Sequence, residues 1–272
     1  MSDAYFVKMR TMLIPHFYDG YRDFFQLAEL AGYETIFVDA VDPESDNTYI
    51  ITPRNGEWNN GWVNPKARII HWDLEWRLKD GGGYQWEKAE YDDIPGVTEV
   101  WASDKWYSGM INAKYVPLGS HPGLVGTEEP EAADYDLAIM ACLSEDGGRQ
   151  HIFDTLLQAG LSIAPNCWNP DRDKVLKSSA VMLHTHQWRK VRTVAPLRYA
   201  IAAAYAMPLI SEPVEDADIF QDSVLFCEPG QLPEYTANLI RRHEPLLEEH
   251  GQMLHELLCH QYSFRNNVEA AL

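Results

Sequence analysis

The sequence has few cysteines, no long apolar run and no secretion signal. Its 4 cysteines in 272 residues are widely spaced and form no CxxC pair, which indicates reduced, mostly buried thiols rather than a disulfide framework. No apolar stretch approaches the roughly 20 residues that cross a bilayer, and the first residues lack the charged-then-apolar pattern of a signal peptide. These absences predict a soluble, cytoplasmic protein with no membrane partner.

Positive charge and the familiar nucleotide-binding motifs are also scarce. The chain carries 22 Lys and Arg residues against 41 Asp and Glu residues, a net charge of −19. This charge disfavours a nucleic-acid partner, because phosphates attract cations. Neither GxGxxG nor GxxxxGK[ST] occurs in the sequence. An anionic ligand would therefore need a locally basic pocket.

What the sequence does contain is an alternation of strand and helix patterns. In the first half we expect a helix at 21–31 and strands at 5–14, 35–38, 49–52, 67–70, 99–102 and 115–116. In the more regular second half we expect strands at 136–141, 161–164, 180–183, 208–211 and 223–226, and helices at 149–159, 171–178, 196–206 and 232–242. Such alternation is typical of parallel sheets in α/β proteins.

A composition shift divides the two halves. Residues 119–134 are rich in proline, glycine and acidic residues and lack a periodic apolar pattern, as expected for a linker. The chain is long enough for two α/β lobes of roughly 120 residues each. We expect the lobes at 1–120 and 134–244, followed by an amphipathic helix at 245–260.

The helix expected at 196–206 begins with a cation. Pro196 suits the first helical position, because its φ angle is already helical and its missing N–H costs nothing there. Arg198 lies in the first turn, where a positive charge opposes the helix dipole. This placement makes sense if an anion lies between the helix and the guanidinium. The strand that follows this helix presents Glu212 at its end.

The same layout occurs upstream, at Gly147-Gly148-Arg149, where a helix follows another strand. Glycines let a phosphate approach the backbone, and a helix N-terminus offers free N–H groups. A plain tight turn explains the two glycines equally well. Two arginine-bearing helix N-termini at the ends of two strands together predict a phosphate site.

The segment from His184 to Arg192 is basic in an otherwise acidic chain. His184, Arg189 and Arg192, with Lys190, follow an apolar strand and could neutralise a diphosphate. The pair His184 and His186 could instead hold a metal, but metal sites need three or four ligands and no third one is evident nearby. We therefore expect no bound metal and no cofactor. The plain alternative is an exposed basic loop.

Two residues of the first half are candidates for a general base. Asp73 ends an expected strand beside Trp72, and a carboxylate against an aromatic surface suits this role. His16 also ends an expected strand, close to a glycine. Either could deprotonate an acceptor hydroxyl, and either could instead be structural. Tryptophans in this half are further candidates for stacking against a sugar ring, namely Trp72, Trp76, Trp101 and Trp106.

Several short motifs occur in order along most of the chain. They are His71–Trp76, Val100–Asp104, Tyr115–Gly119, Gly148-Arg149, Arg198 ahead of Met207–Ser211, and Tyr262–Arg265. With them the sequence resembles the glycosyltransferases of the two-Rossmann-lobe type (the GT-B fold), in particular the spore-maturation-protein-like branch. The resemblance implies an α/β fold of two Rossmann-like lobes with a cleft between them. It also implies that the C-terminal segment 245–272 packs back on the first lobe.

The same resemblance implies a function. The second lobe would bind a nucleotide-diphosphate sugar and the first lobe a hydroxyl-bearing acceptor, with no metal required. Arg149 and Arg198 match the cations that stabilise the departing diphosphate. Retaining members carry a Glu in the helix before the proline-led strand, where this chain has Ile201, and Glu212 is the nearest candidate to replace it.

Three interpretations stay open. The first is a glycosyltransferase. The second is a non-catalytic protein of the same fold that binds a nucleotide or a nucleotide sugar. The third is another α/β enzyme acting on a phosphorylated metabolite, which would bind a sugar phosphate without preference for a nucleoside.

Overall fold

The computed structural model describes most of the chain. The described residues are 3–8, 15–52, 65–74, 94, 96–127, 135–140, 148–164, 171–186, 193–242 and 244–272. The chain divides into two compact units, each with its own sheet. Unit 1 comprises Met1–Leu118, Ala195–Leu197 and Phe264–Leu272, and unit 2 comprises Gly119–Val194 and Arg198–Ser263. Within the described part of the chain, no helix has the length and apolar character needed to span a bilayer.

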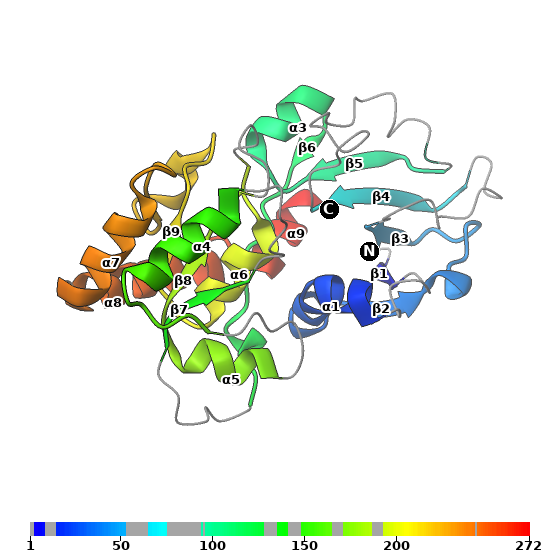
Figure 1. The fold of residues 1–272 in the computed structure, drawn as a ribbon. Coiled ribbons are helices and arrows are strands. Elements are labelled where there is room, and N and C mark those ends of the chain that lie inside the picture. The colour runs from blue at the N-terminus through cyan, green and yellow to red at the C-terminus, as the bar shows by residue number, and fades with distance from the viewer. Residues whose placement is uncertain are drawn as a thin grey trace. The chain divides into compact units, whose positions relative to one another are not determined.

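Unit 1 is built on a parallel sheet of six strands (Figure 1). The strands are β1 (Ala4–Lys8), β2 (Glu34–Phe37), β3 (Thr48–Ile51), β4 (Arg68–Asp73), β5 (Glu99–Ala102) and β6 (Lys114–Tyr115). Their order in the sheet is β2-β1-β3-β4-β5-β6, and all neighbours pair in parallel. The helices are α1 (Pro15–Leu30), α3 (Lys105–Ile111) and α9 (Phe264–Ala271), with a 3-10 turn η2 at Val38–Ala40. Strands β3 and β4, at the centre of the sheet, are almost completely buried, as expected where helices cover both faces of a parallel sheet, whereas the edge strands β2 and β6 are partly exposed.

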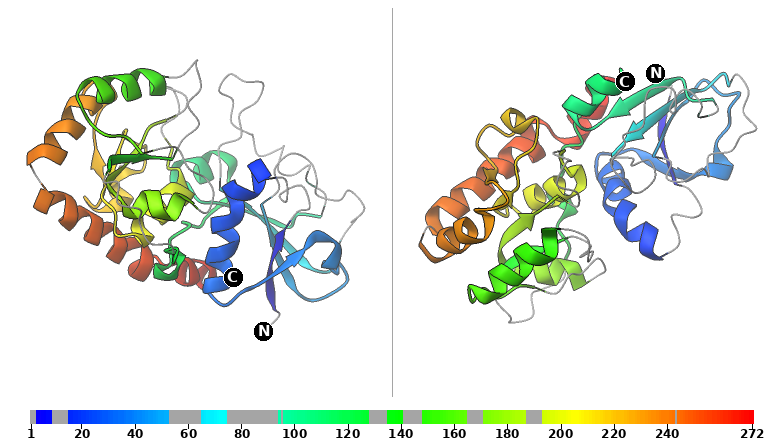
Figure 2. Two further views of the ribbon diagram at one scale, coloured as in Figure 1. Left: turned by 60° about the horizontal axis from the view of Figure 1, so that its bottom comes forward. Right: turned by 45° about the horizontal axis from the view of Figure 1, so that its top comes forward.

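Aromatic rings fill the core of unit 1. Phe6 of β1 meets Phe24 of α1 with ring centroids 5.4 Å apart, and Phe24 meets Trp72 of β4 at 5.6 Å. Phe264 of α9 contacts all three rings, at 5.6 to 6.0 Å. Helix α9, from the end of the chain, thus packs with α1 against the sheet of the first 115 residues (Figure 2). Edge-to-face aromatic contacts of this kind add to the free energy gained by burial.

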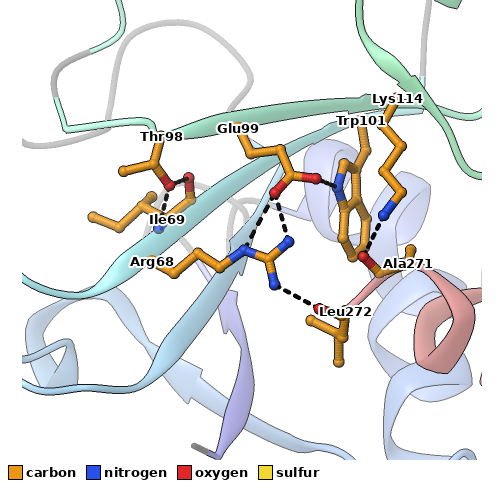
Figure 3. A network of polar contacts seen from close by, with 8 residues as sticks. All are labelled: Arg68, Ile69, Thr98, Glu99, Trp101, Lys114, Ala271 and Leu272. Carbon is orange, nitrogen blue, oxygen red and sulfur yellow. Dashed lines mark hydrogen bonds and ion pairs between the residues drawn. The ribbon is translucent and has the colours of Figure 1, made fainter.

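A polar network also joins α9 to the sheet (Figure 3). Arg68 donates from Nε and Nη2 to Oε2 of Glu99, at 3.2 and 2.5 Å, and from Nη1 to the carbonyl of Leu272 at 2.9 Å. Nζ of Lys114 donates to the carbonyl of Ala271. Cations at the C-terminal end of a helix are favoured by the helix dipole and by its unpaired carbonyl groups. Arg68 and Lys114 therefore fix the position of α9.

Unit 2 has a smaller parallel sheet in the order β10-β9-β8-β7 (Figure 1). The strands are β7 (Tyr135–Ile139), β8 (Ser179–His184), β9 (Leu209–Ser211) and β10 (Leu225–Phe226). The helices are α4 (Gly148–Gln158), α5 (Asp171–Lys177), α6 (Pro196–Ala204), α7 (Leu232–Arg242) and α8 (Glu244–His255), with a π-helix η5 (Glu256–Gln261) and 3-10 turns η3 (Pro122–Leu124) and η4 (Ala217–Phe220). The first two residues of α6 belong to unit 1, and the helix belongs to unit 2 from Arg198 onward. Helices α4 and α7 lie side by side, as do α7 and α8 (Figure 2). Leucine, isoleucine and valine side chains fill the core, in contrast to the aromatic core of unit 1.

Most expected elements are present, but two details differ. The strand expected at 161–164 is a single parallel bridge, between Ile163 and Leu137. His16 was expected at the end of a strand, whereas it is the second residue of α1, which starts at Pro15 because proline favours that position. The α/β prediction itself is confirmed.

The C-terminal segment 245–272 does not behave as one element. Helix α8 and the π-helix belong to unit 2, and only Phe264–Leu272 belongs to unit 1. Gly251 explains why α8 stays with unit 2, since a Cβ at this position would lie 2.2 Å from the carbonyl oxygen of Ala206. The backbone of α8 thus packs directly on the connection between α6 and β9, an approach that only glycine permits.

Candidate functional site

The polar side chains of unit 2 gather at the carboxyl ends of its central strands. His184 ends β8 and pairs in register with Ser211, which ends β9. Helices α4 and α6 begin with the two arginines, because Arg149 is the second residue of α4 and Arg198 is the third of α6. In open α/β sheets this edge is where ligands bind.

Arg149 is attached to the end of β8. Its side chain donates from Nε and Nη2 to the carbonyl of Thr185, at 3.1 and 2.8 Å, and the residue is only 4% exposed. Thr185 is the residue directly after β8. A buried guanidinium in the first turn of a helix opposes the dipole of that helix. Arg149 therefore brings positive charge to the strand edge, at a cost in helix stability.

Arg198 contacts the imidazole of His184. Nη1 of Arg198 lies 3.2 Å from Nδ1 of His184. Arginine can only donate, so Nδ1 must accept and the proton of the neutral ring must be on Nε2. The ring of His184 also meets those of His186 at 5.3 Å and Tyr199 at 5.6 Å.

The environment keeps His184 neutral. Burial lowers the pKa of His184 well below its ordinary value of 6.5, and the positive charges of Arg198, His186 and Arg149 lower it further. All three charged neighbours disfavour an imidazolium. The same positive field favours an anion at this edge of the sheet.

Glu212 holds the loop that follows β8. Its carboxylate Oε2 accepts the backbone N–H of His186, and its own N–H donates to the carbonyl of His184 at 3.2 Å. Nε2 of His186 lies 3.0 Å from the carbonyl of Pro213 and donates to it. Glu212 is 6% exposed. These bonds give Glu212 a structural role in shaping the site, and its expected role in donor binding stays a prediction.

The structure thus brings together four of the expected site residues, Arg149, His184, Arg198 and Glu212, and begins α4 at Gly148. Gly147, Arg189, Lys190 and Arg192 lie outside the described residues. Sequence reasoning missed the Thr185 carbonyl and the hydroxyl pair of Tyr199 and Ser211, 2.8 Å apart. A backbone carbonyl leaves no signal in a sequence. Of these groups, Tyr199 could have been noticed, because it directly follows Arg198 in the sequence.

The two base candidates belong to unit 1. Asp73 is the last residue of β4, is 4% exposed, and accepts through its backbone carbonyl from the N–H and the hydroxyl of Ser103, both at 3.1 Å. The side chain of His16 lies outside the described residues. Trp72 and Trp101 are completely buried and so are core residues rather than sugar platforms, whereas Trp106 is 38% exposed.

No group of three or more His, Cys, Asp and Glu side chains in the described part of the chain is arranged to hold a metal ion. His184 and His186 lie side by side, but no third ligand joins them among the described residues.

No family model and no curated protein matches the sequence. Solved structures do match the fold. The DNA-modifying enzyme β-glucosyltransferase, studied with its substrate uridine diphosphoglucose, has a TM-score of 0.55 at 11% identity, with 100% of this chain and 98% of that chain covered. TarM of S. aureus has a TM-score of 0.56 at 10% identity, covering 89% of this chain and 57% of that chain. Trehalose-6-phosphate synthase has a TM-score of 0.54 at 12% identity, covering 93% and 77%.

These likenesses show the fold. The chain has the mixed α/β fold of GT-B glycosyltransferases, with two Rossmann-like lobes that each carry a parallel sheet. The expected fold class is therefore confirmed. Nothing in the comparisons distinguishes the spore-maturation-like branch from the others, which stays a prediction.

Proposed function

We propose that this protein is a glycosyltransferase that binds a nucleotide-diphosphate sugar in unit 2 and transfers the sugar to a hydroxyl acceptor, without a bound metal. The observation that carries the proposal is the pairing of Arg149 and Arg198 at two helix N-termini, on the ligand-binding edge of a Rossmann-like sheet. Both arginines oppose a helix dipole, and an anion bound beside the guanidinium groups would offset that cost.

The chemistry follows from this charge. Cleavage of the sugar–phosphate bond leaves negative charge on the departing nucleoside diphosphate. Fixed positive groups in a buried site stabilise such charge without reorganisation. Arg149 and Arg198, with the N–H groups at the start of α4, are the groups of unit 2 that would do so. Uridine diphosphoglucose is the first donor to test, since it is the substrate named for the structurally similar β-glucosyltransferase.

The proposal assigns the general base to Asp73, with His16 as the other candidate. Asp73 ends β4, at the carboxyl edge of the sheet of unit 1. If Asp73 removes the acceptor proton, Asp73→Asn will leave donor affinity intact and reduce turnover. An equal loss of both would mean that Asp73 is structural.

The proposal also concerns the acceptor. β-Glucosyltransferase modifies DNA, but the net charge of −19 of this chain disfavours nucleic acid. We therefore propose a hydroxyl-bearing acceptor other than nucleic acid, modified in the cytoplasm. Binding of a DNA duplex at physiological salt would contradict this part.

A thermal-shift screen tests the proposal most directly. UDP, GDP, ADP, TDP and CMP, with their common sugar conjugates, are added with and without EDTA. A ligand that binds only the folded protein raises its melting temperature. The expected result is a shift with one nucleoside diphosphate that EDTA does not abolish, followed by release of labelled sugar from the matching donor. A shift with sugar phosphates alone would favour an enzyme acting on a phosphorylated metabolite.

One observation favours a second function, binding of a nucleotide sugar without catalysis. Ile201 stands where retaining relatives of the resembled family have Glu, and it is 2% exposed within α6. Glu212, the nearest replacement, uses one carboxylate oxygen on the loop after β8. Tight donor binding without release or transfer of labelled sugar would select this second function.

A further inference from the structure

Within the described part of the chain, one ring nitrogen of His184 has a hydrogen-bond partner and the other has none. Nδ1 accepts from Arg198, which fixes the proton on Nε2. Nε2 is buried and has no hydrogen-bond partner among the described residues, and His184 as a whole is only 3% exposed. A buried N–H donor without an acceptor costs folding free energy, and such groups are rare in native proteins.

The position of this donor indicates what it is for. Nδ1 faces Arg198, so Nε2 lies on the opposite edge of the ring, away from that guanidinium. The ring sits at the end of β8, one residue before the carbonyl that holds Arg149. An acceptor placed there would lie in a field made positive by Arg149 and Arg198. The acceptor that fits such a field is an anionic oxygen.

We propose that Nε2–H of His184 donates a hydrogen bond directly to an anionic phosphate oxygen of the donor nucleotide, and that Arg198 acts through Nη1 as the positioning residue that holds His184 in the required tautomer. This inference rests on the proposed function for the identity of the ligand. It differs from simple charge pairing, because the group that touches the phosphate is a neutral donor whose orientation an arginine sets.

Two substitutions of His184 distinguish the acceptor role of Nδ1 from the donor role of Nε2. In His184→Asn the side-chain oxygen can still accept from Arg198, but nothing donates at the place of Nε2. In His184→Gln the longer amide carries an N–H to that place. His250→Asn is the matched control, because His250 also has a buried nitrogen without a partner, Nδ1, but lies in α8.

Calorimetric titration with UDP gives the decisive comparison. His184→Asn should bind UDP roughly ten- to a hundredfold more weakly than the wild type, the effect of losing a hydrogen bond to a charged group. His184→Gln should recover most of the affinity, and His250→Asn should equal the wild type. Equal affinity of His184→Asn and the wild type would overturn the inference, as would failure of His184→Gln to bind better than His184→Asn while both stay folded.

Nuclear magnetic resonance adds a measurement, the chemical shift of Hε2 of His184, that should not respond to UDP if His184 is only structural. The Hε2 proton of His184 should shift downfield on addition of UDP but not of uridine, which lacks phosphate. In Arg198→Met the ring should sample both tautomers, and UDP binding should weaken. If UDP binds but the Hε2 resonance of His184 does not shift, the proposed hydrogen bond from Nε2–H to the phosphate would be overturned.

Inorganic pyrophosphate distinguishes failure of this inference from failure of the proposed function. If the wild type binds pyrophosphate and UDP equally, and His184→Asn weakens both, the histidine role stands and a nucleotide-sugar site does not. If UDP binds tightly and His184→Asn changes nothing, the proposed function stands and the histidine role fails.

Discussion

The cations of the two units serve different purposes. In unit 1, Arg68 donates to the carboxylate of Glu99, and both Arg68 and Lys114 donate to carbonyls at the end of α9. In unit 2, Arg149 and Arg198 donate to a strand-end carbonyl and to a neutral imidazole. Arg68 begins its strand, whereas the arginines of unit 2 lie at the edge where strands end. Arg68 and Lys114, at the starts of their strands, build the fold, whereas Arg149 and Arg198, near the ends of strands, are the cations that we propose bind a ligand.

The largest expected effect comes from removing one cation in each unit. Arg149→Met should weaken binding of the nucleoside diphosphate by about 2–4 kcal/mol, because a buried positive charge beside the phosphate is lost. Arg68→Met is the matched control and should leave this affinity unchanged while lowering the melting temperature. Calorimetric titration and thermal unfolding of both variants measure the difference. Equal loss of affinity in the two variants would show that the comparison between the units is false.

The next largest effect concerns how tightly helices pack. In unit 2, Gly251→Ala would place a methyl group 2.2 Å from the Ala206 carbonyl oxygen, and the required backbone shift should cost about 1–3 kcal/mol. In unit 1, Gly109 of α3 has no atom within 4 Å of an added Cβ. Gly109→Ala should therefore stabilise the protein by about 0.5–1 kcal/mol, since alanine favours helix.

Urea unfolding of the two glycine variants checks this prediction. The signs should be opposite, with Gly251→Ala lowering the midpoint and Gly109→Ala raising it. A stable Gly251→Ala variant would mean that α8 can move away from Ala206 at little cost, and that its place in unit 2 depends on other contacts.

Much of the fold was readable from local patterns. Apolar runs bounded by turn residues predicted the strands of both sheets, because a parallel sheet buries both faces. The bridge at Ile163 was expected as a strand, since sequence does not reveal how far a neighbouring strand extends. The sequence analysis did not predict that α9 packs in a different unit from α8. The packing of Phe264 in α9 depends on the rings of Phe6 and Trp72, which are distant in the sequence.

The candidate site was partly readable for a different reason. Arg149 and Arg198 stand out because the conflict between a cation and a helix dipole is local, and position in the sequence reveals it. The role of Glu212 was not readable, because its partner is a backbone N–H of His186, 26 residues away. The tryptophans show the same limit, since Trp72 and Trp101 look like sugar platforms until their complete burial is known.

A smaller effect is expected in the pH dependence of stability, which should differ between the two units. The folded-state pKa of His184 is lowered below 6.5 by burial and by Arg198, His186 and Arg149, with the Tyr199 ring also packed against it. Just below pH 6.5, His184 is therefore protonated in the unfolded chain but stays neutral in the folded chain. The contribution of neutral His184 to the free energy of unfolding is fully present above about pH 6.5. Below that pH the free energy of unfolding of unit 2 should fall by up to about 1.4 kcal/mol for each pH unit.

Unit 1 should lose stability in a more acidic range. Burial alone would raise the pKa of Glu99, but bonds from Arg68 and Trp101 outweigh it and hold the pKa below 4.5. A bond from Lys8, and then one from Thr35, lowers the pKa of Glu29. These carboxylates stabilise unit 1 above about pH 4.5, and their contribution is lost below it.

Hydrogen exchange with peptide resolution measures the two units in one experiment. Peptides of the β8 region should lose protection progressively as the pH falls below about 6.5, while those of β4 and β5 should lose it only below about 4.5. His184→Asn should remove the first transition and leave the second. Loss of protection in both units over the same range would contradict the assignment of His184.

The smallest effect is expected where a cation is structural and partly exposed. The side chains of Arg68 and Glu99 are 35% and 28% exposed, so solvent screens their attraction, and Glu99→Gln should cost about 0.5–1 kcal/mol. The loss should shrink in high salt, because screening already weakens the wild-type pair. Glu269→Gln is the matched control in the same unit, since Glu269 pairs with Arg265 at a more exposed site. Urea unfolding at low and high salt should separate the two variants at low salt only, and donor binding should be unchanged in both, because the charges of unit 1 build the fold and do not hold the ligand.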